Sequence, residues 1–140
     1  MESEPRFQEL AALAERLGIT IGNADLFDRA LTHSSRVAEE EGVKQDYESL
    51  EFLGDAVLSL AVAQYLYESY PDRTPGEYSR MRADVVSRRS LARAVQDFDL
   101  ASVIRLGKGE EKSGGRHRDA LLADCMESLI AALYLDSGWE

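Results

Sequence analysis

The sequence has few of the residues that cross-link or interrupt a chain. Among its 140 residues are one cysteine and three prolines. Because the single Cys125 cannot form an intrachain disulfide, the chain fits a reducing compartment and depends on its core for stability. The alternating pattern typical of strands is missing, as are internal repeats. We therefore predict one all-helical domain over residues 1–140, a length sufficient for a hydrophobic core.

Long apolar runs are also scarce. The longest, around residues 56–63, is interrupted by Ser59 and is far shorter than the roughly 20 residues of a membrane-spanning helix. The N-terminal stretch MESEPRFQEL is polar and charged, unlike a secretion signal. These features predict a cytoplasmic protein with no membrane partner.

Positive charge is scarce overall but not locally. The formal net charge is −10, yet residues 73–118 hold 11 basic and 6 acidic side chains, whereas residues 1–72 hold 5 basic and 15 acidic ones. Because phosphate contacts depend on local charge, this basic segment (residues 73–118) is compatible with nucleic-acid binding. A basic surface that merely solvates helices fits the composition equally well.

The stretch ESLEFLGDAVLSLAVAQYL, residues 48–66, has the pattern of a long helix with acids at one end. It contains no proline and one glycine. At 100° per residue, Glu48, Glu51 and Asp55 share one stripe. Nearly every other side is apolar, which is typical of a helix buried in a core or an interface. Carboxylates in such a place need a compensating positive charge.

A second segment, residues 119–136, has a similar arrangement. Asp124 and Glu127 are three apart in a helical pattern that is otherwise mostly apolar. If the two helices pack together, these acids join Glu51 and Asp55 in an oxygen-rich cluster. Clusters of this kind hold Mg²⁺ in proteins.

Apolar residues at helical spacing predict further helices. They cover residues 6–17, a short stretch capped by Asn23 or Asp25 that ends at Leu31, residues 77–87, and a stretch that begins at Ser87 or Ser90 and ends at Phe98. Phe7 and Phe98 are predicted on the buried sides of the first and the last. The glycine-rich residues 105–118 and the charged residues 39–46 are predicted as loops. His33, beside Thr and Ser at a helix end, is interpreted as a hydrogen-bonded structural residue rather than a general base.

Five blocks of the sequence agree in content and order with one known family. They are, in chain order, ALTHSS (30–35), ESLEFLGDAVL (48–58), EYSRMRADVV (77–86), KSGG (112–115) and LLADCMESLIAALYLDSG (121–138). From about residue 26 to residue 138 the chain thereby resembles the endonuclease domain of the bacterial ribonuclease III family. The resemblance implies an all-α fold that dimerises through the helix over residues 48–66.

The resemblance also implies an activity. A member of this family would cleave double-stranded RNA with Mg²⁺, for which Mn²⁺ would substitute. Glu51, Asp55, Asp124 and Glu127 would hold the metal, and Asp55 and Glu127 would be the catalytic residues. Attack by metal-activated water would leave 5′-phosphate and 3′-hydroxyl ends at staggered cuts. Ribosomal RNA precursors and messenger RNA would be the substrates.

Further residues receive roles from the same resemblance. Glu48 would contact the RNA or order water around the metal. The residues that would contact RNA phosphates are Arg80, Arg82, Lys112, Ser113 and Arg116. In a homodimer, Phe52 would enter a pocket of the second copy, and Gly54 would let another backbone approach closely. Packing within one chain is the alternative for both Phe52 and Gly54.

Two other functions fit part of the pattern. A non-catalytic relative would dimerise and bind structured RNA, but such relatives lose metal ligands and all four acids are present. A helical hydrolase acting on nucleotides would also use facing acids, but it would leave the basic segment unexplained. Because the usual family layout adds a double-stranded-RNA-binding domain that is absent from this chain, we expect a fragment of a longer protein.

Overall fold

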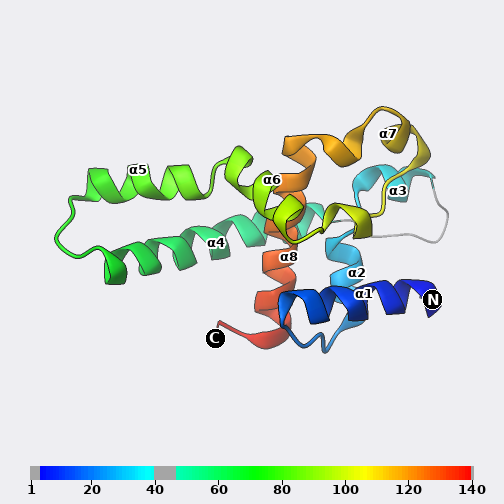
Figure 1. The fold of residues 1–140 in the computed structure, drawn as a ribbon, viewed down its shortest axis with the longest axis horizontal. Coiled ribbons are helices and arrows are strands. Elements are labelled where there is room, and N and C mark those ends of the chain that lie inside the picture. The colour runs from blue at the N-terminus through cyan, green and yellow to red at the C-terminus, as the bar shows by residue number, and fades with distance from the viewer. Residues whose placement is uncertain (1–3, 40–46, 140) are drawn as a thin grey trace.

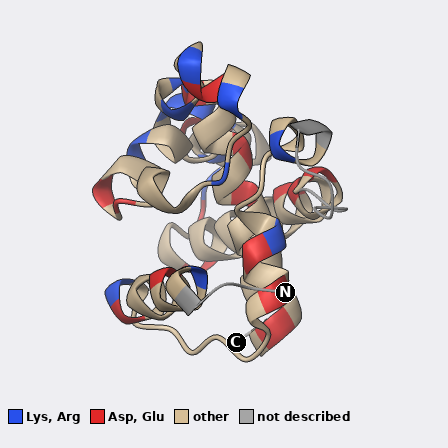
Figure 2. Cartoon of the chain, turned by 90° about the vertical axis from the view of Figure 1, so that its right-hand side faces the viewer, with Lys and Arg blue, Asp and Glu red and all other residues tan. Residues whose placement is uncertain are grey.

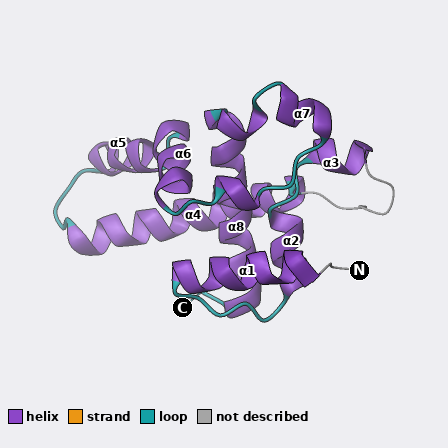
Figure 3. Ribbon diagram, turned by 45° about the vertical axis from the view of Figure 1, so that its right-hand side comes forward, coloured by secondary structure: helices purple, strands orange, loops and turns teal. Residues whose placement is uncertain are grey.

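All regular elements in the described part of the chain are helical (Figure 3). The computed structural model describes residues 4–39 and 47–139. The helices are α1 (Glu4–Leu17), α2 (Ala24–Ala30), α3 (Ser34–Glu39), α4 (Glu48–Ser69), α5 (Pro75–Val85), α6 (Arg88–Asp97), α7 (Lys108–Lys112) and α8 (Asp119–Ser137). Two 3₁₀ turns, Ala101–Val103 and Gly115–His117, flank α7. The all-helical prediction is confirmed. Apart from Glu39, which ends α3, the loop predicted over residues 39–46 lies outside the described residues.

The central helix of the fold is α8, which runs through the middle of the molecule (Figure 1). It packs against α4, α6 and α2. Its neighbours in the core include the buried side chains of Leu13, Phe27, Val95 and Leu100. Cys125 on α8 is fully buried, and this burial raises the pKa of its thiol to about 12. Cys125 is therefore an inert part of the core.

The helix ends follow from local sequence. Gly18 after α1 has a φ of +67°, a conformation that favours glycine. The Asn23 side chain accepts a hydrogen bond from the Leu26 amide and begins α2. Thr74 and Glu77 form a capping box at the start of α5, with Pro75 as its first residue. These ends hold the helices in the positions from which their side chains reach the core.

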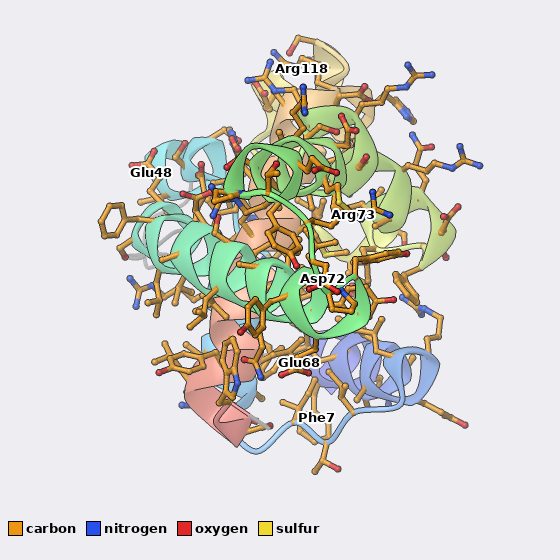
Figure 4. All side chains as sticks on the ribbon, turned by 90° about the vertical axis from the view of Figure 1, so that its left-hand side faces the viewer. Phe7, Glu48, Glu68, Asp72, Arg73 and Arg118 are labelled. Atoms are coloured by element: carbon orange, nitrogen blue, oxygen red, sulfur yellow. The ribbon has the colours of Figure 1, made fainter. Side chains whose placement is uncertain are left out.

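Helices α4 and α5 run side by side out of the body as an arm (Figure 1). Figure 4 views the molecule from the tip of this arm, where Asp72 and Arg73 lie between the two helices. Asp72 has a φ of +69°, which tightens the reversal of the chain after Pro71. The arm leaves much of α4 without cover from its own chain.

The apolar surface of α4 is largely exposed. Its buried residues are Leu50, Gly54 and Leu66, whereas Phe52 is 83% exposed. Within the described residues α4 is also the one helix long and apolar enough to cross a membrane by length and composition. Its charge-free part, between Asp55 and Glu68, is shorter than the roughly 20 residues that a span needs.

Two aromatic residues do not lie where the helical pattern put them. Phe7 is 56% exposed and Phe98 is 47% exposed, so both predicted burials are wrong. On α1 the buried position belongs to Arg6, whose Nε donates to the Asp28 carboxylate at 2.6 Å and whose Nη1 donates to the Val103 carbonyl at 2.7 Å. A buried ion pair between distant residues rotates α1 in a way that apolar spacing cannot predict.

The prediction of a loop over residues 105–118 is also wrong in part. This stretch contains α7 and a 3₁₀ turn. Ion pairs hold them together, Arg116 with Glu111 at 3.0 Å and Arg118 with Glu110. Because these contacts involve charged side chains rather than apolar ones, the hydrophobic pattern gives no sign of the helix.

Candidate metal centre

The site is built where α4 crosses α8, at Gly54. A Cβ atom on Gly54 would lie 1.7 Å from the Glu127 carbonyl oxygen, so only glycine permits this approach. The crossing places Glu51 and Asp55, one turn apart on α4, against Asp124 and Glu127 on α8. The backbone that approaches Gly54 therefore belongs to the same chain. This is the packing within one chain that the sequence left open as the alternative for Gly54, and a place for Gly54 in a dimer interface stays a prediction.

The four carboxylates form one cluster. Glu51, Asp124 and Glu127 each offer an oxygen within 4.8 Å of the others, and all three are half-buried. Asp55 lies close enough to Glu127 to help raise its pKa, as Asp124 does for Glu51. The cluster is an all-oxygen donor set of the kind that hard divalent cations such as Mg²⁺ prefer.

The cluster opens into a cleft of about 590 Å³. Its lining residues are His33, Ser34, Tyr47, Glu48, Glu51, Phe52, Asp55, Asp124 and Glu127. Glu48 is exposed at the start of α4 (Figure 4). The cleft is wide enough for a cation with its water ligands and for a group of a substrate.

Burial and mutual repulsion perturb the acids. Burial, followed by Asp124 and other neighbouring carboxylates, raises the pKa of Glu51 to about 7. Burial, followed by the interaction with the neighbouring Asp55, raises the pKa of Glu127 to about 8. At neutral pH the cluster therefore retains protons that compensate its charge. A bound divalent cation would replace those protons, so the residues fit a metal site.

The raised pKa values predict opposite effects of pH on stability and on metal binding. Both carboxyl groups have an ordinary pKa of 4.5, so between about pH 4.5 and 8 the folded chain binds protons that the unfolded chain has lost. The metal-free melting temperature should therefore fall as pH rises through this window. Mg²⁺ should raise the melting temperature more at pH 8 than at pH 5.5, which thermal melts at fixed ionic strength would measure. An equal shift at the two pH values would contradict this prediction.

The predicted RNA contacts lie in two places on the basic segment. Arg80 and Arg82 are exposed on α5, and Lys112 and Ser113 are exposed at the end of α7. Lys and Arg gather at the end of the molecule that carries α7, at the top of Figure 2. Arg116 is only partly exposed. Its Nη1 donates to the carbonyl oxygens of two core-side residues, Ala101 and Ile104, so its first role is to hold the chain together.

Tyr47 is a residue of the cleft to which the sequence assigned no role in the site. It is 3% exposed, and its ring meets the His33 ring edge-on with centroids 5.5 Å apart. Burial, and then the charge of Asp124, raises the pKa of the Tyr47 hydroxyl, which stays protonated at neutral pH. The feature of the sequence that could have placed Tyr47 in the cleft is its position directly before Glu48. His33 is hydrogen-bonded to Ser35, as the structural interpretation predicts.

A family model described as ribonuclease-III-like matches residues 23–140. The chain belongs to the ribonuclease-III-like family. This confirms the resemblance seen in the five sequence blocks, and it covers both helices that carry the acidic cluster.

The relatives of the chain are longer proteins. Ribonuclease 3 of Bacillus cytotoxicus is 48% identical over 137 residues, which cover 96% of this chain and 56% of that protein. Ribonuclease 3 of Desulforamulus reducens is 49% identical over 129 residues, which cover 91% of this chain and 52% of that protein. The chain thus spans about half the length of these curated relatives.

Solved structures of the family have the same fold. One structure of the nuclease domain of ribonuclease III from Campylobacter jejuni superposes with a TM-score of 0.84 at 33% identity and covers 91% of this chain and 85% of that one. It is described as having structural flexibility in a region involved in dimer formation. Another structure of the same domain gives 0.82 at 31% identity and covers 99% and 87% of the two chains. The described residues therefore have the fold of a ribonuclease III nuclease domain.

Proposed function

We propose that this chain is a ribonuclease III nuclease domain that hydrolyses double-stranded RNA with bound Mg²⁺. The observation that carries the proposal is the crossing of α4 and α8 at Gly54, which gathers Glu51, Asp55, Asp124 and Glu127 in one cleft. All four acids required of an active member are present. This favours the nuclease over a non-catalytic relative that only binds RNA.

The four acids would act as ligands of the metal, directly or through water. When bound, Mg²⁺ supplies a nucleophilic water and neutralises charge on the phosphoryl oxygens, and Mn²⁺ would substitute because it accepts the same oxygen ligands. Because burial and the neighbouring Asp55 raise the pKa of Glu127 to about 8, Glu127 must release its proton before it can serve as a ligand. The products would carry 5′-phosphate and 3′-hydroxyl ends.

The active form would be a homodimer. Phe52 stands next to the acids and is 83% exposed. Beside α4 the same chain has an apolar groove of about 500 Å³, lined among others by Val57, Ala61, Leu133 and Trp139. We propose that Phe52 of each copy enters this groove of the other. Two copies would then place two acid clusters along one duplex and cut its strands at staggered positions.

The substrate would be A-form RNA of the cytoplasm. Proteins read such duplexes through phosphates, 2′-hydroxyls and the minor groove rather than through base sequence. Precursors of ribosomal RNA and structured messenger RNA contain duplexes of this kind. Arg80, Arg82, Lys112 and Ser113 are exposed and would contact phosphates, with affinity that falls steeply as salt rises.

A cleavage assay tests the proposal. An end-labelled RNA duplex should be cut in Mg²⁺ and in Mn²⁺, remain intact in EDTA, and leave 5′-phosphates on its products. Single-stranded RNA and a DNA duplex of the same sequence are the matched controls and should remain intact. Binding of the duplex without cleavage in either metal would instead support the non-catalytic relative. Hydrolysis of free nucleotides with no cleavage of RNA would support the nucleotide hydrolase.

A further inference from the structure

The acidic cleft contains a nitrogen donor that the proposed metal chemistry does not use. Of the described residues that line the cleft, His33 alone has a nitrogen in its side chain. Five of the others are carboxylic acids, which repel a phosphodiester wherever a metal does not neutralise them. A donor on the same wall therefore bears directly on how an anionic substrate is held.

The hydrogen bonds of His33 decide which ring nitrogen holds the proton. The backbone N–H of Ser35 donates to Nδ1 at 3.0 Å, and Ser35 Oγ lies 2.8 Å from the same atom. A backbone amide is always a donor, so Nδ1 must be the acceptor and cannot hold a proton itself. The neutral ring therefore carries its proton on Nε2.

The ring is also fixed in position. Tyr47 packs against it edge-on at an interplanar angle of 85°. The His33 amide donates to the Arg105 carbonyl at 2.9 Å, and Ser35 Oγ accepts from the Gly107 amide at 2.9 Å. These bonds join the edge of the cleft to the basic segment. Within residues 4–39 and 47–139 no group accepts from Nε2, and Nε2 is not enclosed by the protein.

We propose that His33 is a substrate-binding residue whose Nε2–H donates to a non-bridging phosphate oxygen of the RNA strand in the cleft. This inference rests on the proposed nuclease function. A neutral donor suits this place because it binds the phosphate without adding a positive charge that would repel the metal. Since Nε2 holds the proton, His33 acts as a donor and not as a general base.

Two substitutions separate this role from a structural one. In His33→Asn the amide oxygen can take the place of Nδ1 and accept from Ser35, but no donor reaches the place of Nε2. In His33→Gln the amide nitrogen can reach that place as a donor. Duplex affinity would be measured by fluorescence anisotropy with Ca²⁺ in place of Mg²⁺, and kcat and KM would be measured with Mg²⁺. Thermal melts would monitor the fold.

His33→Asn should weaken duplex binding and raise KM roughly tenfold, the loss expected for one hydrogen bond to a charged group, while the melting temperature and the shift caused by Mg²⁺ stay near the parent values. His33→Gln should bind within about threefold of the parent. Parent-like binding and cleavage by His33→Asn would overturn the inference and leave the nuclease function standing. Equal losses in both variants together with a lower melting temperature would also overturn it, because the role would then be structural.

A further control distinguishes a phosphate oxygen from a 2′-hydroxyl as the group that accepts from His33 Nε2–H. The affinity ratio of the parent to His33→Asn should be unchanged on a duplex with 2′-deoxy nucleotides at the cleavage site. A ratio that falls to one would identify a 2′-hydroxyl as the acceptor and overturn the assignment to phosphate. A parent chain that neither binds nor cuts duplex RNA would overturn the proposed function, and this inference with it.

Discussion

Glu127→Gln should lower kcat for duplex cleavage about a thousandfold or more, because metal-ion catalysis contributes several kcal/mol and this change removes a ligand from the centre of the cluster. Glu127 has a carboxylate oxygen within 4.8 Å of an oxygen of Glu51 and of Asp124, and the neighbouring Asp55 helps to raise its pKa. An amide in its place cannot supply the negative charge that replaces a proton when the metal binds. Steady-state cleavage with Mg²⁺ would measure the loss.

The same substitution should stabilise the metal-free protein at pH 8. Burial and repulsion raise the pKa of Glu127 to about 8. The ionised side chain therefore lowers the free energy of unfolding of the metal-free protein. Because the side chain is partly exposed, solvent screening reduces this cost to about 1 kcal/mol. Glu68→Gln, the same chemical change at the far end of α4, is the matched control and should alter neither property. Full cleavage activity in Glu127→Gln would exclude this residue as an essential ligand.

Gly54→Ala should lower the free energy of unfolding by about 3 kcal/mol or more, the upper range for overpacking of a core. The added methyl carbon would lie 1.7 Å from the Glu127 carbonyl oxygen and 2.4 Å from its carbonyl carbon. Both are backbone atoms, so the clash can be relieved only if α4 and α8 move apart. That movement would separate the carboxylates, so stabilisation by Mg²⁺ and duplex cleavage should be lost together. Urea unfolding with and without Mg²⁺ would measure both effects.

Gly76→Ala provides the control for Gly54→Ala. Gly76 lies in α5, and the nearest atom to a new Cβ would be Thr74 Oγ1 at 3.9 Å, which is ordinary contact. Alanine favours a helix over glycine by up to about 1 kcal/mol, so this variant should be slightly more stable than the parent. If Gly54→Ala were as stable as Gly76→Ala, the close crossing would not be required for the fold.

Several structural features were predictable because they depend on neighbours along the chain. The caps at Asn23 and Ser87 and the end of α1 at Gly18 follow from residues within one helical turn. The acids of α4 and α8 share a stripe because of helical spacing alone. The order of five sequence blocks predicted the family, which the comparison with known proteins confirms.

Two of the wrong predictions share a physical cause. Phe7 is exposed because the buried ion pair between Arg6 and Asp28 sets the rotation of α1. The helix over residues 108–112 exists because arginines hold its acids and the carbonyl oxygens nearby. In each case an ion pair makes the decisive contact, and apolar periodicity contains no information about such pairs.

The sequence by itself determined the helices other than α3 and α7, the family and the acids that could hold a metal. Only the tertiary structure decided that the backbone meeting Gly54 is that of Glu127 in the same chain, since a helical pattern does not specify which helix a glycine faces. The structure also decided which ring nitrogen of His33 holds the proton. The Ser35 amide donates to Nδ1 only when residues 33–35 adopt their folded conformation, and this leaves the proton on Nε2. The spacing of side chains along one helix depends only on nearby residues. The meeting of side chains from several helices in one cleft depends on how the whole chain packs.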